Sequence, residues 1–104
     1  MTGFERYLVP GKKGHLIGIG GVSMSPLAEV LVGMGLNIKG SDMSESEKTR
    51  HLRSMGVEVS IGHAAENLGA DTDFVVRTAA VHDENPEIVA AHERGIPVFE
   101  RTQA

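Results

Sequence analysis

The amino-acid sequence predicts an α/β fold, with a five-stranded parallel sheet in the order 3-2-1-4-5 between two layers of helices. Short apolar runs alternate with segments of helical periodicity along the 104 residues, which is typical of a parallel sheet covered by helices. A cluster of glycines directly follows the first apolar run, as at the first strand-to-helix turn of Rossmann-like domains. We therefore expect one three-layer Rossmann-like domain over residues 14–104, after a partly flexible extension over residues 1–13.

The first half of the chain predicts three strands and two helices. The strands are expected over residues 15–19, 37–41 and 57–61. A helix over about 25–34 has one apolar face, because its large apolar residues recur at helical spacing: Leu27, Val30, Leu31 and Met34. A second helix is expected to begin at Ser44, which has capping-box spacing to Glu47, and to end at Gly56.

The second half predicts one short helical turn, two strands and a longer helix. We expect the turn over residues 64–68 and the strands over 73–78 and 96–100. Before the last strand, Asn85 can cap a helix and Pro86 suits its first position. Glu87 complements the positive end of that helix, and Gly95 is expected to end it.

Composition and charge exclude several classes of function. The net charge is −4 and no basic run is present, which argues against binding to nucleic acid or to an anionic membrane. The absence of cysteine excludes disulfides and thiolate metal sites. No apolar run approaches membrane-spanning length, so a cytoplasmic protein is expected.

The sequence predicts neither a metal site nor a catalytic residue. No serine is placed as a nucleophile with a paired base. The residues considered as metal ligands lack a known ligand spacing on one element: His63, His82, Asp83 and Glu84.

The glycine turn Gly18-Ile19-Gly20-Gly21 is the first candidate binding feature. Ligands of open parallel sheets collect at the carboxyl ends of the strands, where this turn lies. Its glycines let the backbone approach a phosphate, and the following helix offers free amides and a positive dipole end. Ser23 and Ser25 add hydroxyl donors. The alternative is a purely structural tight turn. Ser23 also replaces the third glycine of the dinucleotide fingerprint, which indicates different packing or a different ligand.

Three further candidates follow the other strands. Asp42 ends the second strand and can accept hydrogen bonds from a ribose or a base, unless it caps the next helix. His63 follows the third strand and can stack on a base or donate to it, unless it is simply exposed. Small residues follow the fourth strand and either leave room for a ligand or pack beneath a loop: Thr78, Ala79 and Ala80.

Five stretches, in order along the chain, carry a resemblance to a known family. They are His15–Ser25, Gly40–Asp42, Ile61–His63, Asn85–Ala91 and Gly95–Val98. From about His15 to Arg101 the chain resembles the N-terminal domain of the Mur ligases of peptidoglycan synthesis. Within the family it is most similar to the members that add L-alanine to UDP-N-acetylmuramate.

This resemblance implies that the domain binds the uridine diphosphate (UDP) part of UDP-N-acetylmuramate. The residues that match the diphosphate loop are Gly20, Gly21, Ser23, Met24 and Ser25, and we include Gly18 and Val22 of the same turn. Asp42 and His63 match positions near the uridine, and the loop Thr78-Ala79-Ala80 borders the nucleotide. The chain departs from the family pattern at Ser23, Pro26 and Arg77. Arg77 could approach the diphosphate or point to solvent.

The resemblance also implies a reaction to which this chain contributes only binding. In the complete enzyme, ATP phosphorylates the muramyl carboxylate, which the amine of L-alanine then attacks. ATP and Mg²⁺ would bind domains absent here, because the chain has no Gly-x-x-x-x-Gly-Lys-Ser/Thr motif. We therefore expect an excised first domain, inactive alone and without its own cofactor. The alternatives are an NAD(P)-binding domain of an oxidoreductase or regulatory protein, the family's ligase that recycles murein tripeptide, and a domain serving only as an interaction module.

Overall fold

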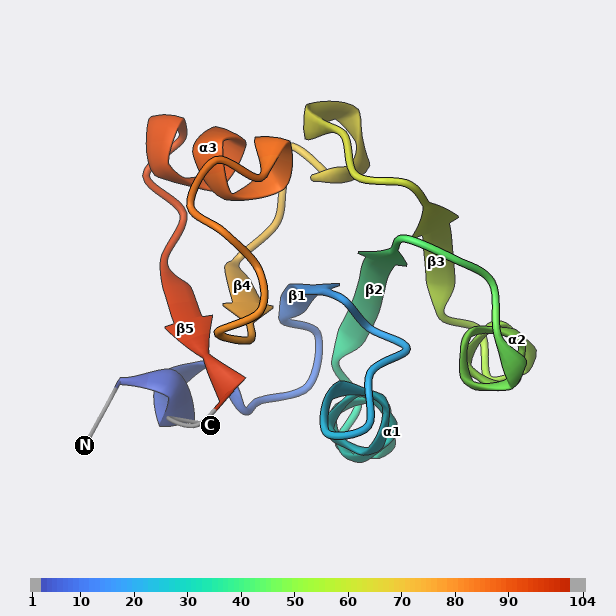
Figure 1. Cartoon of the computed structure of the whole chain (residues 1–104). Coiled ribbons are helices and arrows are strands. Elements are labelled where there is room, and N and C mark those ends of the chain that lie inside the picture. Colours follow the sequence, from blue (N-terminus) through green and yellow to red (C-terminus); the bar gives the residue numbers. More distant parts are fainter. Residues whose placement is uncertain (1–2, 102–104) are drawn as a thin grey trace.

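The computed structural model describes residues 3–101 and contains a five-stranded parallel sheet in the predicted order, β3-β2-β1-β4-β5. The strands are β1 (Lys13–Ile17), β2 (Asn37–Asp42), β3 (Glu58–Ile61), β4 (Phe74–Arg77) and β5 (Val98–Glu100). The helices are α1 (Met24–Gly33), α2 (Glu47–Ser54) and α3 (Pro86–Glu93), with the short 3₁₀ helices η1 (Phe4–Tyr7) and η2 (Ala65–Asn67). α1 and α2 cover one face of the sheet, while α3 and η2 cover the other (Figure 1).

Side chains of the central strands alternate between two apolar cores, as the two-residue period of a strand requires. Leu16 and Val76 belong to the core on the α1 side, and Ile17 and Val75 belong to the core on the α3 side. A sheet that is buried on both faces explains why these strands read as nearly continuous apolar runs.

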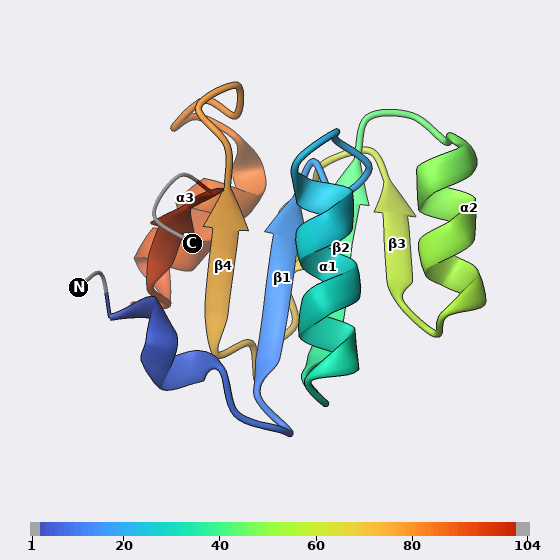
Figure 2. The same cartoon turned by 90° about the horizontal axis from the view of Figure 1, so that it is seen from below.

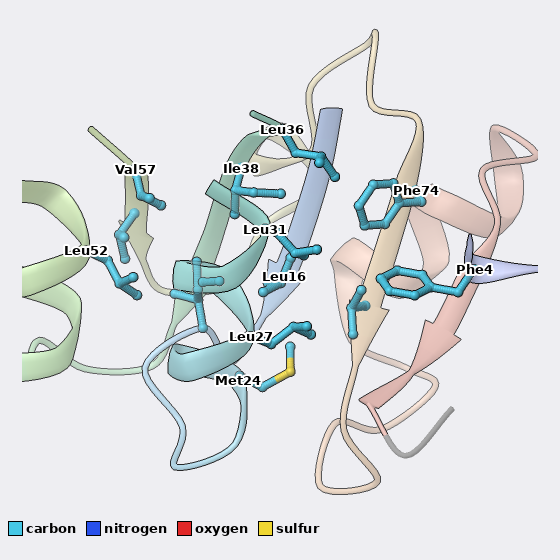
Figure 3. Packing of buried hydrophobic residues seen from close by; sticks show 14 residues of the cluster. Phe4, Leu16, Met24, Leu27, Leu31, Leu36, Ile38, Leu52, Val57 and Phe74 are labelled. Carbon is cyan, nitrogen blue, oxygen red and sulfur yellow. The ribbon is translucent and has the colours of Figure 1, made fainter. Parts of the chain in front are cut away.

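The larger core lies between α1 and the sheet. Leu27 and Leu31 of α1 lie against Leu16 of β1 (Figure 3). Phe4 of η1 is also buried, with its ring edge-on to Phe74, at a centroid distance of 5.4 Å. The segment before β1 therefore contributes to the core of the sheet domain.

The first strand lies two residues earlier than the sequence predicts. Its hydrogen-bonded pairing with β2 ends at Ile17, because Gly18 adopts a positive φ of 78° and turns the chain. The N–H groups of Gly18 and Ile19 both donate to the carbonyl of Ser41, at 2.8 and 2.9 Å. Ile19 is buried, as an apolar strand residue would be, but it lies within the turn.

The capping box of α2 is also shifted by two residues from its predicted position. The cap is Ser46, whose side chain accepts a hydrogen bond from the N–H of Thr49, and the Thr49 hydroxyl accepts one from the N–H of Ser46. The N–H of Ser44 instead donates to Asp42. A threonine at the third helical position therefore performs the role that the sequence assigned to Glu47.

The start of α3 agrees with the prediction. The Asn85 side chain accepts a hydrogen bond from the N–H of Glu87, and Pro86 occupies the first helical position. The strand that follows, β5, begins at Val98, two residues later than expected. The N–H of Ile96 donates back to Ala91, and Pro97 has no N–H to donate. None of the helices within residues 3–101 has the length and apolar character needed to cross a bilayer.

Candidate nucleotide-binding site

A cavity of about 810 Å³ opens at the carboxyl edge of the sheet. Its walls come from the loops after β1, β2, β3 and β4, which lie together at the edge toward which the strand arrows point in Figure 2. This is the edge at which open parallel sheets bind ligands, and the volume suits a nucleotide-sized molecule. A smaller cavity of about 410 Å³ lies by Lys13 and Asn37 at the opposite edge.

Most of the predicted site residues lie together on the larger cavity. Those lining it are Gly18, Gly21, Val22, Ser23, Met24, Asp42, His63, Thr78 and Ala80. Gly20, Ser25 and Ala79 do not line it. The structure adds wall residues that sequence reasoning missed: Met43, Val81, His82, Glu84 and Asn85. Met43 directly follows Asp42, and the other four belong to the loop between β4 and α3, whose length was the signal available in the sequence.

The glycines of the first turn are required for different reasons. Gly18 has a left-handed backbone that side chains rarely adopt. At Gly20, an added Cβ would lie 2.9 Å from the Asp42 carboxylate, and at Gly21 it would lie 3.2 Å from the carbonyl of Gly18. At Gly20 the nearest atoms belong to the side chains of Asp42 and Thr49, so a larger residue there would displace one of them.

The free amides lie just before α1 and at its first residue, where the sequence predicts them. The N–H of Gly20 donates to Asp42 at 2.8 Å, and the N–H of Gly21 donates to the carbonyl of Gly18 at 3.0 Å. Within residues 3–101, no hydrogen bond occupies the N–H groups of the next three residues: Val22, Ser23 and Met24. Because α1 begins at Met24, these donors stand at the positive end of its dipole, an arrangement suited to an anion.

Asp42 joins the glycine turn to the loop after β2. One carboxylate oxygen accepts from the N–H of Gly20, and the other accepts from the N–H of Ser44 at 3.3 Å. Asp42 is not the cap of α2, because Ser46 has that role. It is half-buried at the cavity wall, so its carboxylate both orders the turn and borders the space for a ligand.

A buried polar network lies beneath the His63 side of the cavity. Its centre is Glu87, which has no exposed surface. The Ser41 hydroxyl donates to Glu87 Oε1 at 2.7 Å, and His15 Nε2 lies 2.5 Å from the same oxygen. Asn67 Nδ2 donates to Glu87 Oε2 at 2.9 Å. His63 joins through Nδ1, which lies 2.9 Å from the Ser41 hydroxyl oxygen.

This network keeps Glu87 ionised. Burial raises the pKa of the carboxyl, but hydrogen bonds from His15, Asn67 and Ser41 outweigh that effect and lower it to about 2. The sequence indicated only a helix-start role for Glu87. The histidine inside the otherwise apolar first strand was the one signal that a buried partner was needed.

Arg77 braces the loop between β4 and α3. Its guanidinium donates to the carboxylate of Asp83 at 2.5 Å and to the carbonyl of Val81. The hydrogen bond to Arg77 lowers the pKa of Asp83. The side chain therefore neither projects into solvent nor reaches the glycine turn, and it shapes the cavity wall that contains Thr78 and Ala80. In the part of the chain that the structure describes, no cluster of three metal-ligating side chains occurs.

Most of the chain matches a known protein family. The model of the family described as "Mur ligase family, catalytic domain" matches residues 13–104. The chain belongs to the Mur ligase family. Within this Mur ligase chain, the matched segment includes the whole sheet and every loop around the cavity.

Relatives of known sequence are similarly named. The UDP-N-acetylmuramate–L-alanine ligase of Solidesulfovibrio magneticus is 52% identical over 92 residues, which are 88% of this chain and 20% of that protein. The Mur ligase chain described here thus spans about a fifth of the length of the curated relatives that it matches.

Solved structures agree in fold. The UDP-N-acetylmuramate–alanine ligase of Thermotoga maritima has a TM-score of 0.85 and 40% identity, over 88% of this chain and 21% of that one. A murein peptide ligase of Psychrobacter arcticus has a TM-score of 0.82 and 26% identity, over 89% of this chain and 20% of that one. Identity to the alanine-adding ligase is the higher of the two.

Proposed function

We propose that this chain binds the UDP part of UDP-N-acetylmuramate, as the N-terminal domain of an ATP-dependent ligase that adds L-alanine in peptidoglycan synthesis. One observation carries the proposal. Three unpaired amides at the start of α1 border a nucleotide-sized cavity, in a chain 52% identical over 92 residues to a ligase of that name.

The diphosphate lies on the N–H groups of Val22, Ser23 and Met24, where the helix dipole favours negative charge. The whole domain carries a net negative charge, so this local field has to supply the attraction. Ser23, which lines the cavity, is an additional hydroxyl donor for the phosphate oxygens. Gly18, Gly20 and Gly21 bring the backbone close enough for these contacts.

The uridine lies toward the ends of β2 and β3. The Asp42 carboxylate accepts hydrogen bonds from the ribose or the base, in addition to its bonds to the turn. The His63 ring contacts the uridine from the neighbouring loop. The small residues Thr78 and Ala80 border the nucleotide on the β4 side, and Ala79 lies between them in the same loop. We assign no catalytic residue, metal or cofactor to this chain.

The remaining chemistry belongs to parts of the ligase that this chain lacks. We assign ATP, Mg²⁺ and L-alanine to them, because the chain has no Gly-x-x-x-x-Gly-Lys-Ser/Thr phosphate loop. Residues 14–104 are then one domain of a larger enzyme, which we place in the cytoplasm, and the chain alone does not form the amide bond. The higher identity to the alanine-adding ligase favours it over the tripeptide-recycling ligase.

Calorimetric titration tests the ligand class. We expect UDP-N-acetylmuramate and UDP to bind the chain at least tenfold more tightly than NADH, a difference of about 1.4 kcal/mol. The adenine dinucleotide is the control for a general Rossmann-like diphosphate site. Binding of NADH with no heat from the uridine nucleotides would overturn the proposal in favour of the oxidoreductase alternative.

A further inference from the structure

We propose that Glu87, acting through Ser41, holds the His63 ring with its proton on Nδ1 and presents Nε2 to the bound uridine. Glu87 and Ser41 are then positioning residues of the nucleotide site, although neither lines the cavity. The identity of the ligand in this inference rests on the proposed function. The position of the proton on the His63 ring does not depend on the proposed function, and it can be measured in the protein without ligand.

The position of the His63 proton follows from the donors that are available. Ser41 has a single hydroxyl hydrogen, which it donates to Glu87 Oε1. Its oxygen can therefore only accept from His63 Nδ1, which lies 2.9 Å away. Glu87 Oε2 lies 3.4 Å from the same nitrogen, so the nearby carboxylate also favours a proton there.

Glu87 is firmly held in the orientation that this chain of bonds requires. His15 and Ser41 share one carboxylate oxygen, while Asn67 and the N–H of Ala64 donate to the other. Glu87 and Ser41 have no exposed surface, and they lie on α3 and β2. A buried network in which the carboxylate is fully bonded resists rearrangement, because each lost bond would leave an unpaired polar group.

The opposite side of the His63 ring faces accessible space. The side chain is 18% exposed and lines the cavity. Within the described residues Nε2 has no hydrogen-bond partner, yet it is not among the buried unpaired atoms, so it is accessible. With the proton on Nδ1, the neutral ring offers Nε2 as an acceptor. An N–H of the base or a hydroxyl of the ribose is the matching donor.

Nitrogen-15 NMR of the His63 ring tests the inference without a ligand. In the wild-type protein at a pH where the ring is neutral, we expect a protonated Nδ1 and an unprotonated Nε2. In Ser41→Ala, we expect the Nδ1 preference to weaken, because only the 3.4 Å approach of Glu87 Oε2 then favours a proton on that nitrogen. Ser60→Ala is the matched control, because Ser60 pairs with Ser41 across β2 and β3 and its hydroxyl makes no hydrogen bond among residues 3–101. It should leave the ring unchanged.

Binding measurements test the link to the nucleotide. Ser41→Ala should weaken UDP binding roughly threefold to tenfold, the worth of one hydrogen bond. In a His63→Ala background the same change should have no further effect, because Ser41 acts through the ring.

Three outcomes would overturn the inference. They are a wild-type ring protonated on Nε2, a proton distribution on the ring that Ser41→Ala leaves unchanged, or a loss of UDP affinity in Ser41→Ala that is equal with and without His63. The wild-type spectrum decides the ring state even if Ser41→Ala fails to fold. If the wild-type protein does not bind UDP, the proposed function fails, while the ring measurement still stands.

Discussion

Ser41 connects the two parts of the site at the scale of a single residue. Its carbonyl accepts hydrogen bonds from the N–H groups of Gly18 and Ile19. These bonds fix the turn that precedes the free amides at the start of α1. Its hydroxyl links Glu87 to His63. Backbone and side chain of one buried residue thus position the glycine turn and the His63 side of the cavity together.

Glu87 should make the protein sensitive to acid. Its pKa is lowered from 4.5 to about 2 in the folded chain, so its ionised form stabilises the fold above pH 4.5. That contribution should disappear as the pH falls from 4.5 toward 2. Chemical denaturation across this range should therefore show a smaller loss of stability in Glu87→Gln, which starts from a lower stability at neutral pH.

Glu93→Gln is the control for this prediction, because Glu93 is an exposed carboxylate on the same helix. It should show the same acid limb as the wild-type protein. An unchanged acid limb in Glu87→Gln would mean that the buried carboxylate does not contribute to acid sensitivity.

At the scale of elements, close contact between β2 and the β1 turn depends on Gly40. A Cβ added there would lie 2.3 Å from the carbonyl oxygen of Leu16 and 2.8 Å from the Ile19 side chain. A backbone oxygen in the central strand cannot move away without distorting the sheet. The glycine of the Gly40-Ser41-Asp42 stretch is therefore a packing requirement of the site.

Replacing this glycine should be costly. We expect Gly40→Ala to lower the free energy of unfolding by about 3 kcal/mol or more, at the upper end of overpacking effects. Gly33→Ala is the matched control, because Gly33 lies at the end of α1 with open space around it. This variant should raise the free energy of unfolding by up to about 1 kcal/mol. Urea denaturation of both variants measures the difference. Equal stabilities would contradict the close packing.

The elements themselves were largely predictable, because apolar runs and helix-start residues are local signals. α3 was placed correctly from Asn85 and Pro86. The start of α2 was misplaced because Ser44 and Ser46 both suit a cap, and only the extended backbone of Ser46 decides between them. The C-terminal end of β1 depends on the left-handed turn at Gly18, which the apolar pattern does not reveal.

At the scale of the whole molecule, elements that cover opposite faces of the sheet contribute to one site at its carboxyl edge. The glycine turn leads into α1 on one face, while Glu87 lies in α3 on the other. The sequence could predict which loops surround the cavity, because strand order determines that edge. It could not predict that the Gly20 and Gly21 amides are already bonded, nor that Glu87 supports His63, because both depend on long-range contacts.

We propose that the diphosphate of a uridine nucleotide lies on the amides of Val22, Ser23 and Met24. Amide chemical shifts of the protein titrated with UDP, and separately with uridine, test it most directly. We predict that UDP shifts these three amides strongly while uridine, which lacks phosphate, leaves them nearly in place. If saturating UDP leaves all three amide shifts unchanged, or if uridine changes them equally, the diphosphate does not bind these amides.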